Sequence, residues 1–175
     1  METPIFLIGY MGSGKTTLGK KLARKMDMPF IDLDEYIVQE IGMTIPQYFQ
    51  INGEDKFRAL ERQYLHQLAG KQAIISTGGG TPCFYDNMAW INRHGLSIYL
   101  AHSPKGLWSR LIKTDRESRP ILAGKSPEEL LDFITEKLAE RSPYYSQAQL
   151  SINQLNSKID DIVNEIMSHI TVASR

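Results

Sequence analysis

The sequence has little cysteine and no excess charge of either sign. Among its 175 residues there is one cysteine, Cys83, so the chain cannot form an internal disulfide bond. Chains of this kind are typical of reducing compartments. Lys and Arg number 20 and Asp and Glu number 20, which gives a formal net charge of 0 at pH 7. No overall field therefore draws the chain to nucleic acid or to an anionic membrane surface, and any basic site must be local.

Long apolar segments are also missing. No hydrophobic stretch approaches the roughly 20 residues that a membrane-spanning helix needs. The stretch from Met1 to Pro4 lacks the basic region of a signal peptide. The sequence contains no internal repeat and no low-complexity tract. We therefore expect a cytoplasmic protein with a single domain over residues 1–175.

Short apolar runs alternate with amphipathic stretches along the chain. Strands are predicted at residues 5–8, 29–33, 73–76, 96–100 and 150–152. Helices are predicted at residues 15–26, 34–42, 53–69 and 84–94, from Pro104 onward, from Pro127 to Pro143, and near 157–170. Apolar strands separated by helices predict a three-layer α/β/α fold with a central five-stranded parallel sheet.

Two parts of the second half carry specific signals. Ser126-Pro127-Glu128-Glu129 forms a capping box with proline in the first turn, and it should begin a long helix. Pro143 lacks an N–H group and should end that helix. Residues 113–125 are polar and have no periodic apolar face. A long irregular segment in a compact domain is often functional, and we expect a mobile lid there.

Residues 9–16 read Gly-Tyr-Met-Gly-Ser-Gly-Lys-Thr and match a complete phosphate-binding loop. Glycines let the backbone curl around phosphate oxygens with its N–H groups inward, and the following helix directs its positive end at the same anion. Lys15 would add charge at the β- and γ-phosphates, and the Thr16 hydroxyl would meet magnesium. The expected nucleotide contacts are Gly12, Ser13, Gly14, Lys15, Thr16 and Thr17. The alternative is an ordinary glycine-rich turn.

Five shorter motifs follow this loop. They are Asp32-Leu33-Asp34 at the second strand, Phe57-Arg58-x-x-Glu61 on a helix, Gly78-Gly79-Gly80 after the third strand, Arg119-Pro120 in the polar segment, and Arg141-x-x-Tyr144-Tyr145. In their order and spacing the sequence resembles the shikimate kinase family from Ile5 to about Ile152. The resemblance implies a P-loop kinase of the nucleoside-monophosphate-kinase type.

The resemblance also implies an activity and its partners. The enzyme would transfer the γ-phosphate of ATP to the 3-hydroxyl of shikimate, on the route to chorismate and the aromatic amino acids. Magnesium would be its cofactor, and shikimate and ATP its small-molecule substrates. We expect a monomer that binds neither nucleic acid nor membrane.

On the phosphate side, the resemblance assigns catalytic roles to Lys15, Asp34 and Arg119. Asp34 would hold the reacting hydroxyl and take its proton, and Asp32 would meet magnesium together with Thr16. Arg119 would swing with the lid onto nucleotide and transferring phosphate. Lys113, Arg110 and Arg116 are further candidates for nucleotide contacts.

On the acceptor side, the resemblance assigns Arg58, Arg141, Gly79 and Gly80, together with Asp34, to shikimate. A planar guanidinium matches a carboxylate with two parallel hydrogen bonds. Glycines without side chains would let the backbone approach the substrate closely.

Each assignment has a plain structural alternative. Asp34 could merely cap a helix that begins at Glu35, and Arg141 could merely complement the end of a helix dipole. Arg58 could belong to a solvated face with Glu54, Glu61 and Arg62. The triple glycine could be a tight turn and Arg119 a surface residue. We expect Cys83, Trp90, Trp108 and the four histidines (His66, His94, His102 and His169) to be structural.

Two other functions stay open at the level of the residues. Another small-molecule kinase could act on gluconate or a nucleoside monophosphate, although paired arginines favour a carboxylate acceptor. A regulatory nucleotide switch is the second alternative. The sequence lacks the Asn-Lys-x-Asp motif that reads guanine and has no long interaction tail.

Overall fold

The computed structural model describes residues 3–113, 122, 124–153 and 158–173. Its sheet consists of β1 (Ile5–Ile8), β2 (Phe30–Asp32), β3 (Ile74–Ser76), β4 (Leu96–Leu100) and β5 (Leu150–Ile152). The strands lie in the order β2-β3-β1-β4-β5, and every neighbouring pair is parallel. The predicted five-stranded parallel sheet is therefore confirmed.

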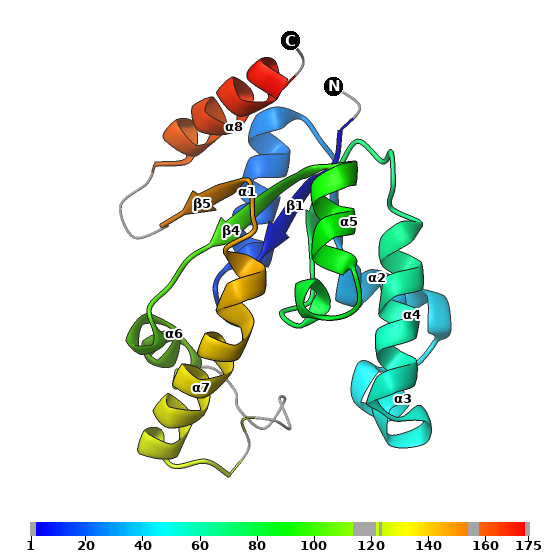
Figure 1. Ribbon diagram of the computed structural model, residues 1–175, viewed down its shortest axis with the longest axis vertical. Helices are drawn as coiled ribbons and strands as arrows, with labels where there is room; N and C mark the ends of the chain where they lie inside the picture. The colour runs from blue at the N-terminus through cyan, green and yellow to red at the C-terminus, as the bar shows by residue number, and fades with distance from the viewer. Residues whose placement is uncertain (1–2, 114–121, 123, 154–157, 174–175) are drawn as a thin grey trace.

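Helices cover both faces of this sheet (Figure 1). They are α1 (Lys15–Met26), α2 (Leu33–Ile41), α3 (Ile45–Asn52), α4 (Glu54–His66), the 3₁₀ turn η1 (Thr81–Cys83), α5 (Asn87–His94), α6 (Pro104–Leu111), α7 (Pro127–Tyr145) and α8 (Ile159–Ala173). Within the part of the chain that the structure describes, none of the helices has the length and apolarity to cross a membrane.

The strand β1 shows why the fold has three layers. Its residues alternate between two hydrophobic clusters, because successive side chains of a strand point to opposite faces. Phe6 and Ile8 belong to the cluster that contains residues of α2, α4, α5 and α7. Ile5 and Leu7 belong to the cluster that contains residues of α1 and α8. All four side chains are fully buried, which explains the continuous apolar run in the sequence.

Helix α3 was not predicted. It begins after Thr44, whose side chain accepts a hydrogen bond from the Gln47 amide while Gln47 bonds back, a complete capping box with proline in the first turn. The Phe49 ring packs against Phe57 of α4, with ring centroids 4.7 Å apart. The capping signal was present in the sequence, but the helix is short and buries none of its residues completely.

The prediction that Pro143 ends its helix was wrong, because α7 continues to Tyr145. Proline removes its own N–H donor and crowds the preceding turn, but later residues can still donate. The Ser146 amide donates to the Ser142 carbonyl over 2.9 Å. The Ser142 hydroxyl also donates to the Leu138 carbonyl over 2.7 Å. The proline lies so near the end that only the last turn has to adjust.

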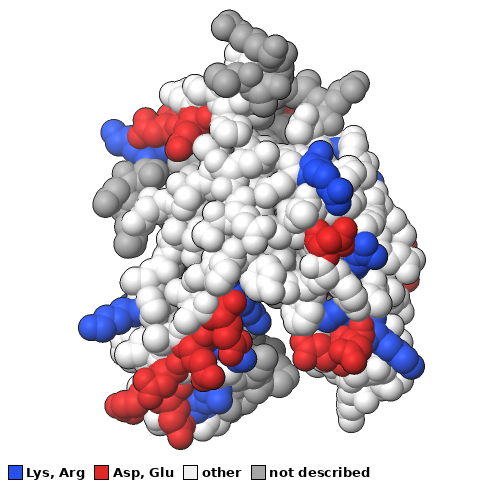
Figure 2. Space-filling view, in the orientation of Figure 1, with Lys and Arg blue, Asp and Glu red and all other residues white. Residues whose placement is uncertain are grey.

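In the parallel sheet, the loops that follow four of the strands lie at the same end of the sheet. The segments that follow β1, β2, β3 and β4 all begin at the carboxyl ends of neighbouring strands, where ligands bind in open α/β sheets. Figure 2 shows a deep notch between the part of the molecule that carries α6 and α7 and the part that carries α3 and α4.

Candidate active site

The loop after β1 contains three glycines with left-handed backbone angles. Gly9, Gly12 and Gly14 have φ values of 145°, 74° and 93°, which other residues rarely adopt. Gly14 is the N-cap of α1, so the loop leads into the positive end of a helix dipole. The structure therefore gives the predicted setting, a glycine-rich loop between a buried strand and a helix.

Lys15 folds back over this loop. Its ammonium group donates hydrogen bonds to the carbonyls of Gly9, over 2.7 Å, and Tyr10, over 3.0 Å. The residue is only 8% exposed. The carbonyls thus hold a nearly buried positive charge against the segment that the sequence predicts to bind phosphate.

Two side chains beyond β4 support the loop from outside. His102 Nε2 lies 2.9 Å from the Ser13 carbonyl, and Arg110 Nη1 donates to the Gly12 carbonyl over 3.2 Å. Burial lowers the pKa of His102, and the charges of Arg110 and Lys15 lower it further against the opposing bond to Ser13. The neutral imidazole must carry its proton on Nε2 to donate to a carbonyl. His102 was expected to be structural, and its position beside the loop was not predicted from the sequence.

Asp32 joins the loop helix to the second strand. Its Oδ2 accepts a hydrogen bond from the Thr16 hydroxyl over 2.9 Å. Its Oδ1 accepts from the amides of Asp34 and Glu35, so Asp32 is the N-cap of α2. The alternative in which Asp34 caps a helix beginning at Glu35 was wrong, because the helix starts two residues earlier. The cap leaves the Asp34 carboxyl available for other partners.

Asp34 lies in the first turn of α2 and faces the triple glycine. A Cβ atom on Gly78 would be 2.9 Å from Asp34 Oδ1. Burial, together with the charges of Glu61 and Asp32, raises the pKa of Asp34 to about 6, against the opposing charges of Lys15 and Arg58. Its carboxylate therefore has an unusually high proton affinity for an aspartate.

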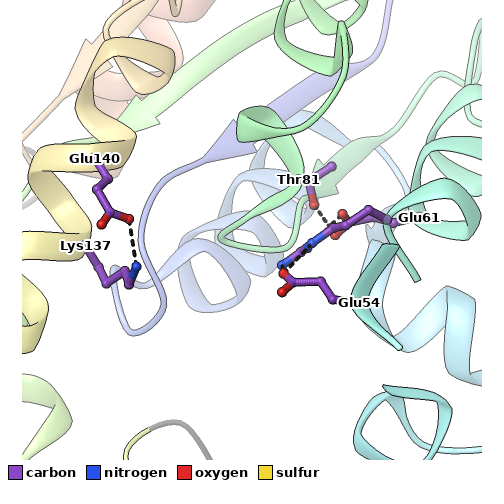
Figure 3. Close-up of polar contacts among 6 residues, drawn as sticks. Glu54, Glu61, Thr81, Lys137 and Glu140 are labelled. Atoms are coloured by element: carbon purple, nitrogen blue, oxygen red, sulfur yellow. Dashed lines mark hydrogen bonds and ion pairs between the residues drawn. The ribbon is translucent and has the colours of Figure 1, made fainter. Parts of the chain in front are cut away.

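Arg58 is held by carboxylates on both sides along α4. Its Nη1 donates to Glu61 Oε2 over 3.0 Å, and its Nη2 donates to Glu54 Oε1 over 3.1 Å. Its guanidinium also lies 4.1 Å from the centroid of the Phe84 ring. Glu61 in turn accepts a hydrogen bond from the Thr81 hydroxyl over 2.7 Å (Figure 3).

Arg58 is mostly buried, which contradicts the alternative in which it belongs to a solvated charged face. The side chains of Arg58 and Glu61 are 12% and 1% exposed. The next arginine on the helix, Arg62, is 41% exposed and pairs with Asp86 over 2.8 Å. The alternative therefore describes Arg62 and not Arg58.

The triple glycine brings the two predicted substrate arginines together. A Cβ atom on Gly80 would lie 2.9 Å from both terminal nitrogens of Arg58. A Cβ atom on Gly79 would lie 3.4 Å from Arg141 Nη1 and 3.2 Å from the Met11 amide of the loop. A larger residue at Gly80 would displace the Arg58 guanidinium, and one at Gly79 would crowd the Met11 amide of the loop, so both glycines do more than form a turn.

The lid falls mostly outside the described residues. Arg119, Arg116 and Pro120 all belong to that part, and the arginine clamp stays a prediction. The described Leu122 is fully buried and packs in the cluster that contains α6 and α7. The Trp108 ring N–H donates to the Pro127 carbonyl over 2.8 Å, which links α6 to the start of α7.

The structure describes the surroundings of several residues that were expected to be structural. Trp90 is stacked between His66 and His94, with centroids 4.5 Å and 4.2 Å away. Burial raises the pKa of the Cys83 thiol to about 11, which disfavours a reactive thiolate. Among the described residues, no group of three or more His, Cys, Asp or Glu side chains could hold a metal ion.

One residue in contact with the predicted site, Tyr145, was not predicted from the sequence. The Tyr145 hydroxyl donates to the Gly79 carbonyl over 2.6 Å, and the residue is fully buried. It belongs to the Arg141-x-x-Tyr144-Tyr145 motif, but the sequence offered no reason to choose it over Tyr144. The spacing of four from Arg141 was the available signal, since i and i+4 share a helix face.

The parallel sheet, the glycine loop opening α1 and the polar groups opposite it define a P-loop small-molecule kinase. A family model described as shikimate kinase matches residues 11–171. The chain belongs to the shikimate kinase family.

Individual relatives agree with this placement. A shikimate kinase from Bacteroides thetaiotaomicron is 51% identical over 150 residues, which cover 85% of each chain. A crystal structure of shikimate kinase from that organism superposes with a TM-score of 0.87 at 46% identity, covering 97% of this chain and 98% of the other. A shikimate kinase from Acinetobacter baumannii, solved in complex with shikimate, has a TM-score of 0.81 at 31% identity, covering 98% and 94%.

Proposed function

We propose that this chain is an ATP-dependent phosphotransferase that converts shikimate and ATP into shikimate 3-phosphate and ADP. It would act in the biosynthesis of chorismate and the aromatic amino acids. Membership of the family supports this activity. The observation that carries it here is the approach of two guanidinium groups, those of Arg58 and Arg141, to the glycines beside the phosphate loop.

The loop would bind the triphosphate of ATP. Gly12, Ser13 and Gly14 would present backbone amides, and Lys15 would exchange its bonds to the loop carbonyls for bonds to the β- and γ-phosphates. Thr16 and Thr17 follow at the first turn of α1, where the helix dipole favours an anion. Because phosphoryl transfer depends mainly on positioning and charge neutralisation, this cradle supplies a large part of catalysis.

Thr16 and Asp32 would hold magnesium. They place a hydroxyl and a carboxylate oxygen 2.9 Å apart at the start of α1, and Mg²⁺ prefers such hard oxygen ligands. Magnesium in kinases keeps several waters and takes further ligands from substrate phosphates, so two protein groups are sufficient. When bound, the ion would neutralise charge that develops on the phosphates.

Arg58 and Arg141 would bind the carboxylate of shikimate, with the Gly79 and Gly80 backbone beside the ring. Glu54 and Glu61 hold the Arg58 guanidinium in place from both sides. A cation fixed before substrate arrives loses little side-chain entropy on binding. In Figure 3 the Glu61, Thr81 and Glu54 side chains lie across from Lys137 and Glu140 of α7, with the loop after β1 between them.

Asp34 would hold the reacting 3-hydroxyl. As the hydroxyl oxygen bonds to the γ-phosphorus, the bond from that phosphorus to the β,γ-bridging oxygen breaks. The hydroxyl proton passes to the Asp34 carboxylate, and ADP leaves with the bridging oxygen. The raised pKa of Asp34, about 6, favours this proton transfer over what an ordinary aspartate would offer.

The remaining assignments complete the proposal. Arg119, in the lid at about residues 113–125, would close onto the transferring phosphate and help to exclude water. Residues 1–175 would form one domain that works as a cytoplasmic monomer, without nucleic-acid or membrane partners.

A coupled assay of ADP release tests the activity. Purified protein receives ATP and magnesium with shikimate, quinate, gluconate or nucleoside monophosphates in turn. We expect turnover with shikimate far above that with the others. Turnover only with gluconate or with a nucleotide would replace the proposal. Omitting magnesium should abolish activity, and full activity in the presence of a chelator would contradict the metal assignment.

A further inference from the structure

Tyr145 and Arg141 approach the same glycine from the same helix. Both lie on α7 four residues apart, so they share one face of it. The Tyr145 hydroxyl donates to the Gly79 carbonyl over 2.6 Å. The Arg141 Nη1 lies 3.4 Å from where a Gly79 Cβ would be. Tyr145 therefore binds the carbonyl of Gly79, and Arg141 lies beside the α-carbon of the same residue.

The Tyr145 hydroxyl completes the hydrogen bonding of the triple glycine. The Gly78 carbonyl accepts from the Thr81 amide over 3.2 Å, and the Gly80 carbonyl accepts from the Cys83 amide over 2.8 Å. The carbonyl between them, that of Gly79, accepts from Tyr145. Each glycine carbonyl of the segment thus has a defined partner, and only the middle one depends on a side chain from a distant helix.

The bond to Gly79 also orients the next amide. A trans peptide unit is planar, and its carbonyl and N–H point in opposite directions. Fixing the Gly79 carbonyl toward Tyr145 therefore fixes the direction of the Gly80 N–H. Glycine has more backbone freedom than any other residue, so a run of three would otherwise sample several orientations of this peptide.

Tyr145 itself is held rigidly. It is fully buried, and its ring stacks on Tyr99 of β4 with centroids 5.2 Å apart. Burial raises the pKa of the Tyr145 phenol, although the neighbouring Arg141 charge lowers it. The hydroxyl thus stays protonated and donates its hydrogen bond throughout the neutral range.

We propose that Tyr145 is a positioning residue for the acceptor substrate, which it serves by fixing the Gly79–Gly80 peptide relative to Arg141. This inference rests on the proposed function and extends it to a residue that does not itself touch the substrate. Losing the hydroxyl leaves the Gly79 carbonyl without its donor and frees the peptide to rotate. The acceptor site is then disordered while the phosphate loop keeps its own hydrogen bonds.

The test compares Tyr145→Phe with Tyr144→Phe. The first keeps the ring and its stack on Tyr99, and the second removes the hydroxyl of the neighbouring exposed tyrosine. We expect Tyr145→Phe to raise KM for shikimate about five- to tenfold, with KM for ATP unchanged, since an unsatisfied buried carbonyl costs free energy of that order. Tyr144→Phe should match the wild type in both constants.

A merely structural tyrosine would give a different pattern. Tyr145→Phe would then lower the melting temperature but leave both KM values of the folded enzyme unchanged, which would overturn the proposal. In a double-mutant cycle with Arg141→Lys, the two effects on shikimate binding should be less than additive because both act at Gly79. Full additivity would also count against it.

Two further measurements keep the proposal testable. If Tyr145→Phe does not fold, NMR relaxation of the wild type without substrate should give the Gly80 amide an order parameter near that of rigid backbone, about 0.85. A value below about 0.6 would overturn the proposal. Wild-type turnover of shikimate separates the two ideas: its absence removes the proposed function, and its presence with an unchanged Tyr145→Phe variant removes only the role of Tyr145.

Discussion

Asp34 and Glu61, two carboxyl groups from different helices, meet at Gly78. A Cβ atom on this glycine would lie 2.9 Å from Asp34 Oδ1 and 3.0 Å from Glu61 Oε1. Glu61 is paired with Arg58 and Thr81, so its charge is compensated. Asp34 bears the electrostatic consequence, since burial and the charges of Glu61 and Asp32 raise its pKa to about 6.

This raised pKa predicts that Asp34→Asn stabilises the unliganded protein. Folding raises the pKa from 3.8 to about 6, so the ionised form is disfavoured in the folded state. That penalty is complete above pH 6, and it disappears as the pH falls toward 3.8 and both states become protonated. Asparagine is neutral throughout. We expect a gain of about 1–3 kcal/mol in the free energy of unfolding near neutral pH.

Urea denaturation of both proteins at about pH 8 and about pH 4.5 measures this difference. Taking the variant minus the wild type cancels the titration of the groups that do not interact with Asp34. The gain should shrink at the lower pH. Asp132→Asn, on the exposed surface of α7, serves as control and should show no gain at either pH. An advantage of Asp34→Asn that is independent of pH would show that Asp34 is not an ionised, unfavourably placed carboxylate.

The same substitution should abolish catalysis. Asparagine has nearly the shape of aspartate but cannot accept the hydroxyl proton, so turnover should collapse while nucleotide affinity survives. In the wild type, kcat/KM for shikimate should fall as the pH drops through about 6, because the protonated Asp34 no longer accepts a proton. Steady-state kinetics and titration calorimetry with ATP check both points. Wild-type turnover in Asp34→Asn would remove Asp34 from the site.

Substitutions of the two arginines should affect one substrate selectively. Truncating a buried arginine that pairs with a substrate carboxylate costs about 2–5 kcal/mol of binding. Arg58→Ala and Arg141→Ala should thus raise KM for shikimate far more than KM for ATP. Arg58→Ala also leaves Glu61 unpaired and will destabilise the fold.

Arg58→Lys separates these two effects. It keeps a positive charge beside Glu61 but lacks the planar fork that matches a carboxylate. We expect KM for shikimate to rise with little change in the melting temperature. Arg62→Ala, one turn further along α4, is the matched control because Arg62 is exposed and pairs with Asp86. Equal effects of the Arg58 variants on both substrates would contradict the assignment.

Two glycines allow a similar separation for the nucleotide. Gly12 and Gly42 have nearly the same left-handed φ, 74° and 69°. A Cβ atom on Gly12 would lie 2.7 Å from Leu111 Cδ2, whereas a Cβ on Gly42 would meet nothing within 4 Å. Both alanine variants should lose about 1–2 kcal/mol of stability from the strained backbone. Only Gly12→Ala should also weaken ATP binding, because it displaces the loop. Calorimetry that finds unchanged ATP affinity in Gly12→Ala would exclude a role of this loop geometry.

Where sequence-based prediction succeeded, the signals are local. The glycine-rich loop at residues 9–16 directly follows the buried strand β1 and leads into helix α1, so all the signals for it lie in one continuous segment. The strand β1 is a continuous apolar run, which burial on both faces explains. The sheet then follows from the alternation of strands and helices.

What could not be predicted depends on long-range packing. Gly80, which follows β3, lies against Arg58 of α4. No spacing in the sequence predicts this contact. The helix cap falls on Asp32 and not on Asp34, because β2 ends immediately before α2. Helix α7 continues past Pro143, and this carries Tyr145 to Gly79. A local rule, that proline ends a helix, was overridden by hydrogen bonds near the helix end.

The bond between His102 and the Ser13 carbonyl, 2.9 Å long, gives the last prediction. His102 follows β4 and touches the loop from outside, so it should affect nucleotide binding without contacting shikimate. His102→Ala removes the donor and should raise KM for ATP several-fold, as expected for the loss of one hydrogen bond worth about 1 kcal/mol. KM for shikimate should not change.

His102→Gln distinguishes support of the loop from general packing. The glutamine amide can place an N–H group close to the position of Nε2, so it should restore most of the ATP affinity that alanine loses. The electrostatic alternative makes the opposite prediction. If a positive charge on His102 attracted the phosphates, glutamine would be as poor as alanine, and the wild type would bind ATP more tightly as the pH falls through the pKa of His102. That pKa is already lowered by burial and by Arg110 and Lys15. We therefore expect the difference between His102→Ala and the wild type to be constant above neutral pH, with glutamine close to the wild type.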